Sequence, residues 1–309
     1  MTISIIIPTK NRYQDILNTV KSIGEQICLP DEFIIVDQNT SDDVKNCVIP
    51  LFDSFDSFKK HKTILKYIHN PQINGLTQAR NRGIEKNESD IVFFFDDDVI
   101  LEKDFIFNVM EIYKKHPEIF GVSGIMTNYR VGFIESILRR IFELGNFYDQ
   151  RIALYINRRY KDAEYVPVSM LYGGLTSYRK EVFEEFSFDE NLIKYALGED
   201  IDFSFRVSRK YKTVIAPGAR LIHVESNAGK SNDRKFKENL VFMSHYFFKK
   251  NMDKNLGNYL RFIWLNVGYL VNSIILAAKM NIDFLIGNII GLKKLIKGGE
   301  CEFIRSSKQ

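Results

Sequence analysis

Three consecutive aspartates, Asp96, Asp97 and Asp98, directly follow a purely apolar run, Ile91–Phe95. The run is too short for a core helix and too apolar for a strand with one face in water, so it predicts a strand buried on both faces of a parallel sheet. Open α/β folds bind ligands at the carboxyl ends of such strands. Three carboxylates crowded there repel one another unless a cation neutralises them, and oxygen ligands favour Mg²⁺ or Mn²⁺. A helix-capping turn is the simpler alternative, but it explains one aspartate better than three.

The first half of the chain alternates apolar segments with helix-like segments. Strand candidates are Ser4–Ile7, Phe33–Val36, Ile64–Ile68, Ile91–Phe95 and Phe120–Ile125. Helix candidates lie near Tyr13–Ile23, Asp42–Leu51, Leu76–Glu85 and Lys103–Lys115. This alternation predicts βαβ units with right-handed crossovers, and hence an α/β fold with a doubly wound, mostly parallel sheet.

Polar residues recur where the predicted strands end. Pro8–Arg12 follow the first strand, Asp37–Asp42 the second and Asp96–Asp98 the fourth. Each segment alone is ordinary turn chemistry. Because the carboxyl ends of parallel strands share one edge, the three segments together predict a single ligand-binding crevice.

Other segments each have a functional and an ordinary interpretation. Asn74-Gly75 is a turn signal, and Arg80 of the following helix is either a phosphate partner or a solvated side chain. The pair Gly173-Gly174 either lets the backbone approach a ligand or forms a plain loop. Asp200 opens a helix as a cap or acts as a general base. His223 is either a structural histidine or a third metal ligand.

Composition restricts the class of protein. The 309 residues carry 43 basic and 39 acidic side chains, a net charge of +4, so the chain as a whole is not a nucleic-acid binder. Its three cysteines, Cys28, Cys47 and Cys301, show no paired spacing, so we expect neither a disulfide framework nor a zinc site. With no signal-peptide pattern at the N-terminus, this fits the reducing cytoplasm.

The composition changes past residue 230, so we expect a catalytic domain over 1–230 and a helical, membrane-associating segment over 231–309. Asn258–Ala278 is just long enough to span a bilayer, but its polar residues lie largely on one side and lysines flank it. This favours a helix lying in the membrane interface. Phe236–Lys250, Ile282–Ile296 and the earlier Phe133–Phe142 are further helix candidates, the last two apolar with basic neighbours. The alternative is packing onto the catalytic domain or a dimer contact.

In their order along residues 1–225, these motifs resemble glycosyltransferase family 2, whose members have the A-type glycosyltransferase fold. The resemblance rests on the opening Ser4–Arg12, on Val36-Asp37, on Gly75 with Arg80-Asn81 and Gly83, on Asp96 and Asp98, on Gly173-Gly174, and on Glu199-Asp200. The chain departs from the family after the second strand. The family often has Val-Asp-Asp-Gly-Ser there, whereas this chain has Val36-Asp37-Gln38-Asn39-Thr40, so Asp37 alone carries the base-binding acid.

The resemblance implies a metal-dependent, inverting transfer of one sugar from a nucleotide-diphospho-sugar to a glycan or lipid-linked acceptor, in surface polysaccharide synthesis at the inner face of the cell membrane. It implies Mg²⁺ or Mn²⁺ on Asp96 and Asp98, and Asp200 as the catalytic base. His223 is a candidate third metal ligand on the residue argument given above, not on the resemblance. The implied donor-binding residues are Pro8, Thr9, Asn11, Arg12, Asp37, Gly75, Arg80 and Asp97. The implied acceptor-side residues are Gly173, Gly174 and Glu199.

Two other functions fit parts of the pattern. A nucleotidyltransferase also uses a doubly wound sheet with carboxylate-held Mg²⁺, but Pro8–Arg12 lacks the glycines of its phosphate loop. A non-catalytic sugar- or lipid-binding scaffold would not require Asp96, Asp98 and Asp200 together. A processive polysaccharide synthase would carry a later Gln-x-x-Arg-Trp motif, and the only tryptophan here is Trp264.

Overall fold

The computed structural model describes residues 1–156, 160, 162–194, 197–224, 233–278, 281–298, 301 and 304, except the side chains of residues 153 and 156. The chain forms two compact units. Unit 1 comprises Met1–Tyr129, Asn157–Glu190 and Glu199–Ala228, and unit 2 comprises Arg130–Ile156, Asn191–Gly198 and Gly229–Gln309. Unit 2 therefore adds two earlier segments to the C-terminal one.

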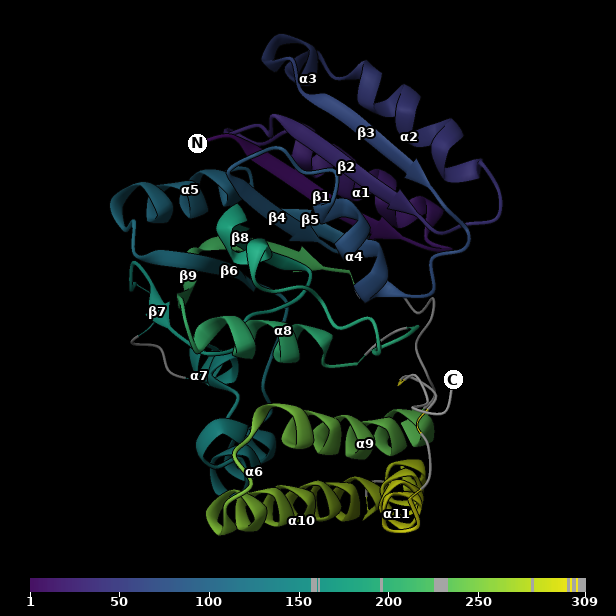
Figure 1. Ribbon diagram of the computed structural model, residues 1–309, viewed down its shortest axis with the longest axis vertical. Coiled ribbons are helices and arrows are strands. Elements are labelled where there is room, and N and C mark those ends of the chain that lie inside the picture. The colour runs from purple at the N-terminus through teal and green to yellow at the C-terminus, as the bar shows by residue number, and fades with distance from the viewer. Residues whose placement is uncertain are drawn as a thin grey trace. The chain divides into compact units, whose positions relative to one another are not determined.

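Unit 1 is built on a mixed nine-stranded sheet of order β3-β2-β1-β4-β8-β6-β9-β5, with β7 also paired to β9 (Figure 1). The strands are β1 Ile3–Thr9, β2 Glu32–Asp37, β3 Ile64–His69, β4 Ile91–Phe95, β5 Val99–Leu101, β6 Ile119–Met126, β7 Val166–Pro167, β8 Leu175–Arg179 and β9 Lys212–His223. Strands β1 to β4, β6 and β9 run in one direction, and β5, β7 and β8 run in the other. The predicted mostly parallel α/β sheet is confirmed.

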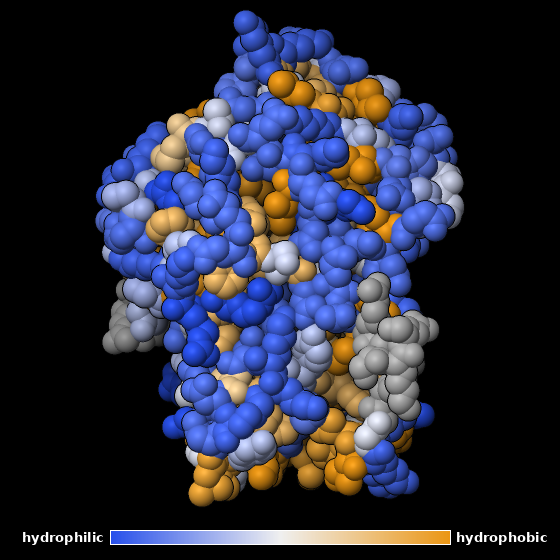
Figure 2. All heavy atoms as spheres, viewed as in Figure 1, coloured by the Kyte–Doolittle hydropathy of each residue, from blue (hydrophilic) through white to orange (hydrophobic). Residues whose placement is uncertain are grey.

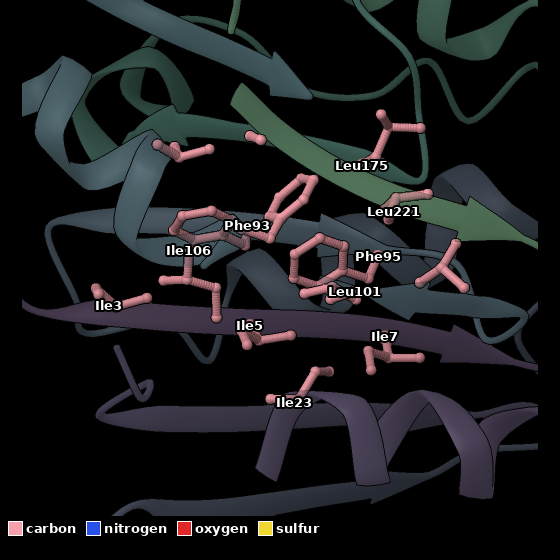
Figure 3. Packing of buried hydrophobic residues seen from close by; sticks show 14 of the residues in the cluster. Ile3, Ile5, Ile7, Ile23, Phe93, Phe95, Leu101, Ile106, Leu175 and Leu221 are labelled. Carbon is pink, nitrogen blue, oxygen red and sulfur yellow. The ribbon is translucent and has the colours of Figure 1, made fainter. Parts of the chain in front are cut away.

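Alternation along the central strands sets the core. Ile3, Ile5 and Ile7 of β1 lie on one face, as the two-residue period of a strand requires, and belong to the same buried cluster as Phe93 and Phe95 of β4 (Figure 3). Burying each such side chain contributes about 1.5–3 kcal/mol to folding. The rigid β1–β4 pair therefore fixes the segments that follow these two strands.

The helices of unit 1 connect and cover these strands. They are α1 Tyr13–Gly24, α2 Asp43–Ser54, α3 Asp56–His61, α4 Leu76–Ile84, α5 Phe105–Lys115 and α8 Glu199–Ser208, with the 3₁₀ turn η3 Lys180–Glu184. Each helix predicted for the first half is present. Gly83 in α4 lies against Ile6 of β1, where a Cβ would come within 2.4 Å of Ile6 Cγ2, so this glycine lets α4 approach the sheet closely.

Unit 2 is helical in the part of it that the structure describes. Its helices are α6 Phe133–Phe142, α7 Gln150–Ile156, α9 Asp233–Asn251, α10 Leu256–Ala278 and α11 Ile282–Ile296, with the 3₁₀ turn η1 Gly145–Phe147. Helix α11 packs against α9 and α10, and α6 packs against α10. The predicted C-terminal helices are thus confirmed.

Candidate functional site

The candidate site lies at the carboxyl ends of β4 and β9. Asp96, Asp97 and Asp98 follow β4 directly, and His223 is the last residue of β9. Antiparallel pairing of β9 with β5 places His223 opposite Val99, the residue after Asp98. As a result, His223 Nε2 lies 3.0 Å from Asp98 Oδ1.

Asp96, Asp98 and His223 form a potential metal-binding set. Each offers one ligand atom, and these atoms all lie within 4.8 Å of one another. Two carboxylates and one imidazole are donors suited to a divalent cation, and the carboxylates favour Mg²⁺ or Mn²⁺. The donor chemistry therefore fits the predicted metal.

Arg12 links Asp97 to Asp98, which also belongs to the metal-binding set. Its Nη1 donates to Asp97 Oδ1 at 2.9 Å and to Asp98 Oδ2 at 2.8 Å. The Thr9 hydroxyl donates to Asp97 Oδ2 at 2.7 Å. Burial raises the pKa of Asp97 to about 7, although Arg12 and Thr9 oppose that shift. Asp97 is therefore engaged by the protein itself. Contacts of Thr9, Arg12 and Asp97 with a nucleotide-sugar stay predictions.

Arg80 connects the metal-binding set to the acidic pair that opens α8. Its guanidinium is buried, with Nη2 3.2 Å from Asp96 Oδ1 and Nη1 2.6 Å from Glu199 Oε1. The Phe188 ring lies 5.2 Å from its central carbon. The solvated-helix interpretation of Arg80 is therefore wrong. Burial raises the pKa of Glu199 to about 8, and Arg80 acts in the opposite direction.

The two glycines before β8 leave room for this network. A Cβ at Gly174 would lie 2.1 Å from Asp96 Oδ2, and one at Gly173 would lie 2.8 Å from Glu199 Oε1. Distances below about 3 Å are contacts that side-chain carbons do not make, so both positions require glycine unless the carboxylates move. The plain-loop interpretation of this pair does not account for such close approach.

Asp200 follows Glu199 in the first turn of α8 and is partly exposed. Its Oδ1 accepts a hydrogen bond from the Ile201 amide at 2.9 Å. Its negative charge raises the pKa of both Arg80 and Glu199, as does the charge of Asp96. The acidic pair and the metal-binding set are therefore coupled electrostatically through Arg80.

A second polar cluster surrounds Asp37 at the end of β2. The amide and the side-chain nitrogen of Asn39 donate to Asp37 Oδ1 at 2.8 and 2.6 Å, and Tyr67 donates to Oδ2 at 2.5 Å. Gln38 Oε1 is buried with no hydrogen-bond partner among the described residues. A buried orphan acceptor is costly unless a ligand satisfies it, so Gln38 is a candidate contact for a nucleobase.

The remaining predicted donor-side residues shape the backbone around these clusters. Pro8 lies opposite Val36 in the β1–β2 ladder. Asn11 adopts a left-handed conformation, with φ of 58°, and its amide donates to Asn39 Oδ1 at 2.7 Å. Gly75 has φ of 115° at the start of α4, a conformation that favours glycine. Sequence reasoning did not single out Tyr67, which no local motif marks.

Several curated proteins resemble this chain. An uncharacterized glycosyltransferase of Rickettsia conorii is 28% identical over 186 residues, which cover 59% of this chain and 27% of that protein. An uncharacterized glycosyltransferase of Bacillus subtilis is 26% identical over 74% of this chain and 76% of its own length. A Campylobacter jejuni GalNAc(5)-diNAcBac-PP-undecaprenol beta-1,3-glucosyltransferase is 32% identical over 31% of this chain and 29% of its own length.

Solved structures share the fold. A mannosyltransferase from Pyrobaculum calidifontis, in complex with GDP-Man and Mn²⁺, matches with a TM-score of 0.63 at 15% identity over 96% of this chain and 88% of its own. GalNAc-T7 with UDP, GalNAc and Mn²⁺ matches with a TM-score of 0.56 at 17% identity over 80% of this chain and 50% of its own. The sequence model for glycosyl transferase family 2 matches residues 4–187, which include β1, β2, β4 and the three aspartates. With that match over more than half of its length, the chain belongs to glycosyl transferase family 2.

Proposed function

We propose that this protein transfers one sugar from a nucleotide-diphospho-sugar to a hydroxyl of a glycan or lipid-linked acceptor, with inversion at the anomeric carbon. The observation that carries the proposal is the convergence of Asp96, Asp98 and His223 beside the buried Arg80–Glu199 pair. This arrangement joins a cation-binding set to an acidic pair, and a metal-dependent, base-assisted sugar transfer uses both.

Asp96, Asp98 and His223 would hold Mg²⁺ or Mn²⁺, which when bound supplies positive charge to a diphosphate leaving group. Gln38 and Asp37 would contact the nucleoside from the second polar cluster. Arg80 keeps Asp96 in position through its ion pair and adds positive charge nearby. Pre-arranged charges of this kind stabilise a transition state without reorganising during the reaction.

Asp200 would take the proton from the acceptor hydroxyl as that hydroxyl attacks the anomeric carbon. The carboxyl of its neighbour Glu199 is engaged by Arg80 at 2.6 Å, which favours Asp200 as the base. Attack from the face opposite the leaving group breaks the bond to the diphosphate in a single displacement. The transition state resembles an oxocarbenium ion, and one base suffices.

We also propose that the acceptor is lipid-linked and that the protein works at the inner face of the cell membrane in surface polysaccharide synthesis. The support is the similarity to the Campylobacter glucosyltransferase, whose name specifies an undecaprenol-linked glycan. A glucosyl-dolichyl phosphate glucuronosyltransferase of Haloferax volcanii, 27% identical over 40% of this chain and 38% of its own, points to the same acceptor class.

The test is a thermal-shift screen of common nucleotide-sugars with and without Mn²⁺. One donor should raise the melting temperature only with Mn²⁺, because a ligand at one hundred times its Kd stabilises the folded state by about 2.7 kcal/mol. Asp98→Ala should abolish that shift, whereas Asp53→Ala, at an exposed position of α2, should keep it. An equal, metal-independent shift in wild type and Asp98→Ala would overturn the metal assignment.

A further inference from the structure

Helix α10 carries its large apolar side chains on the outside. Among the described residues it is the helix whose length and hydropathy would allow it to cross a membrane. Its exposed apolar residues recur at spacings of three and four and therefore form one stripe along the helix. They are Leu256, Leu260, Ile263, Trp264, Val267 and Ile274, with exposed fractions from 38% for Val267 to 74% for Leu256.

Helix α6 adds a second apolar stripe. None of its residues is buried, and Phe133, Ile134, Ile137 and Ile141 are exposed. Trp264 Nε1 donates to the Ile141 carbonyl at 2.8 Å, so the two helices lie side by side. Leu144, two residues beyond the end of α6, lines an open groove of about 360 Å³ with Leu260, Arg261, Ile263 and Trp264. These two stripes and Leu144 are called the apolar face below.

The interior of unit 2 holds polar side chains beside apolar ones such as Phe242 and Leu265. Asn288 is buried in α11 and donates to the Tyr269 carbonyl at 2.9 Å and to the buried Ser273 hydroxyl. Buried Glu238 of α9 accepts a hydrogen bond from Lys294 at 2.8 Å. Figure 2 shows hydrophobic side chains gathered on the surface over α10 and α11. Soluble monomeric proteins rarely expose large contiguous apolar patches, so this surface calls for a partner.

The charge of unit 2 also differs from that of unit 1. Unit 2 has 19 basic and 9 acidic residues, a net charge of +10, whereas unit 1 has 24 basic and 30 acidic residues, a net charge of −6. A basic unit with an exposed apolar face is complementary to a surface that is both anionic and oily. The same net charge opposes pairing of two copies through this face.

We propose that the apolar face docks onto an anionic lipid bilayer, with α6 and α10 lying in the plane of the interface. This inference rests on the proposed function and deepens it by naming the surface and the lipid charge that hold the protein at the membrane. Helix α6 has 10 residues and is about 15 Å long, half of the hydrocarbon thickness. Because α6 shares the face with α10, both lie on the membrane rather than through it.

Trp264 is the only tryptophan, so its fluorescence reports on the apolar face alone. In wild-type protein mixed with vesicles containing phosphatidylglycerol, its emission should shift to the blue. If α10 lies in the plane, lipids brominated near the carbonyl end of the acyl chain should quench it most. If α10 spans, Trp264 lies about 5 Å from the helix centre, and bromine near the terminal methyl should quench it most, which overturns the in-plane arrangement.

Flotation tests the face by mutation. Wild-type protein should float with phosphatidylglycerol-containing vesicles, weakly with phosphatidylcholine alone, and less at high salt. The double variant Leu260→Glu, Ile263→Glu should bind at least about ten-fold more weakly at an unchanged melting temperature, because two exposed apolar side chains no longer enter the bilayer. Ile27→Glu, at an equally exposed position of unit 1, should bind like wild type.

Three results would overturn the proposal: wild-type protein that stays unbound, a double variant that binds like wild type, or a solution dimer that the double variant disperses. The last would assign the face to a second copy. The Mn²⁺-dependent rise in melting temperature with a nucleotide-sugar, measured without vesicles, tests the proposed function separately from this inference. A donor shift without flotation defeats only the docking inference, and flotation without any donor shift defeats only the transfer reaction.

Discussion

In unit 1 the central strands are apolar and fully buried, and charged side chains gather where β4 and β9 end. In unit 2 the interior combines apolar side chains such as Phe242 with buried Asn288 and Glu238, while Leu256, Ile263 and Trp264 are exposed. The comparison teaches that the distinguishing feature of unit 2 is its exposed apolar face, on which the docking proposal rests.

Each unit also pairs a glutamate with an arginine. In unit 1 Arg80 pairs with Glu199 and extends to Asp96. In unit 2 Arg139 donates to Glu143 at 2.7 Å and to Glu135 at 2.9 Å. Only the first pair reaches a candidate metal ligand, so the same interaction serves the site in unit 1 and stabilises helix α6 in unit 2.

The largest expected effect is on kcat, and it tests whether the catalytic base lies in unit 1. Asp200→Asn should lower kcat about 10³-fold, because a general base contributes about 10²–10⁴ to the rate. The Mn²⁺-dependent donor shift should remain. Asp253→Asn, an exposed carboxylate of unit 2, should leave kcat unchanged. Steady-state transfer rates measure both variants, and full activity in Asp200→Asn would remove Asp200 from the reaction.

An intermediate effect compares two crowded glycines. Gly174→Ala should weaken Mn²⁺-dependent donor binding at least about ten-fold, because the new Cβ would lie 2.1 Å from Asp96 Oδ2 and displace that carboxylate. Gly268→Ala should instead lower the free energy of unfolding by about 1–3 kcal/mol, because its Cβ would lie 2.4 Å from Phe142 Cβ, between α10 and α6.

Thermal-shift titrations and thermal unfolding separate the two outcomes for these glycines. Donor binding should be normal in Gly268→Ala and impaired in Gly174→Ala. If both variants lost donor affinity equally, donor binding would depend on unit 2 as much as on unit 1, and the comparison would fail.

The most gradual effect concerns pH. Burial raises the pKa of Glu199 to about 8 and of Glu143 to about 7, above the ordinary value for glutamate. A group whose pKa is higher in the folded state stabilises the fold fully below its unfolded pKa and loses that contribution as the pH rises through the folded pKa. Unfolding free energy should therefore fall between about pH 4.5 and those values, by at most about 1.4 kcal/mol per pH unit for each group.

Gln variants check this slope. Glu199→Gln should flatten the fall up to about pH 8, and Glu143→Gln only up to about pH 7, in unfolding free energies measured as a function of pH. An unchanged slope in both variants would show that neither carboxyl binds a proton in this range.

Strands β1, β2 and β4 could be predicted because their apolar residues run on without interruption. Strand β8 escaped prediction because Thr176 and Ser177 interrupt its pattern, although both are buried and donate to the Val122 carbonyl. Its insertion between β4 and β6 makes the sheet mixed at that point. Long-range partners of this kind decide where a polar strand residue is tolerated, and a single sequence does not contain them.

The candidate site divides in the same way. Asp96–Asp98, Gly173-Gly174 and Glu199-Asp200 are adjacent residues and could be found as local motifs. The bridging position of Arg80 could not, because Glu199 lies far along the chain and only folding brings it to α4. The position of His223 beside Asp98 could not be predicted either, because it depends on the pairing of β5 with β9.

The pairing of Arg12 and Arg80 with the aspartates has a consequence for cofactor exchange. Arg12 contacts Asp97 and Asp98, and Arg80 contacts Asp96, so the carboxylate triplet is held together by the protein's own cations. A structural zinc site behaves differently, since its fold depends on the ion. Here a chelator should leave the melting temperature of the donor-free protein nearly unchanged, and the metal could enter and leave a fold that is already complete.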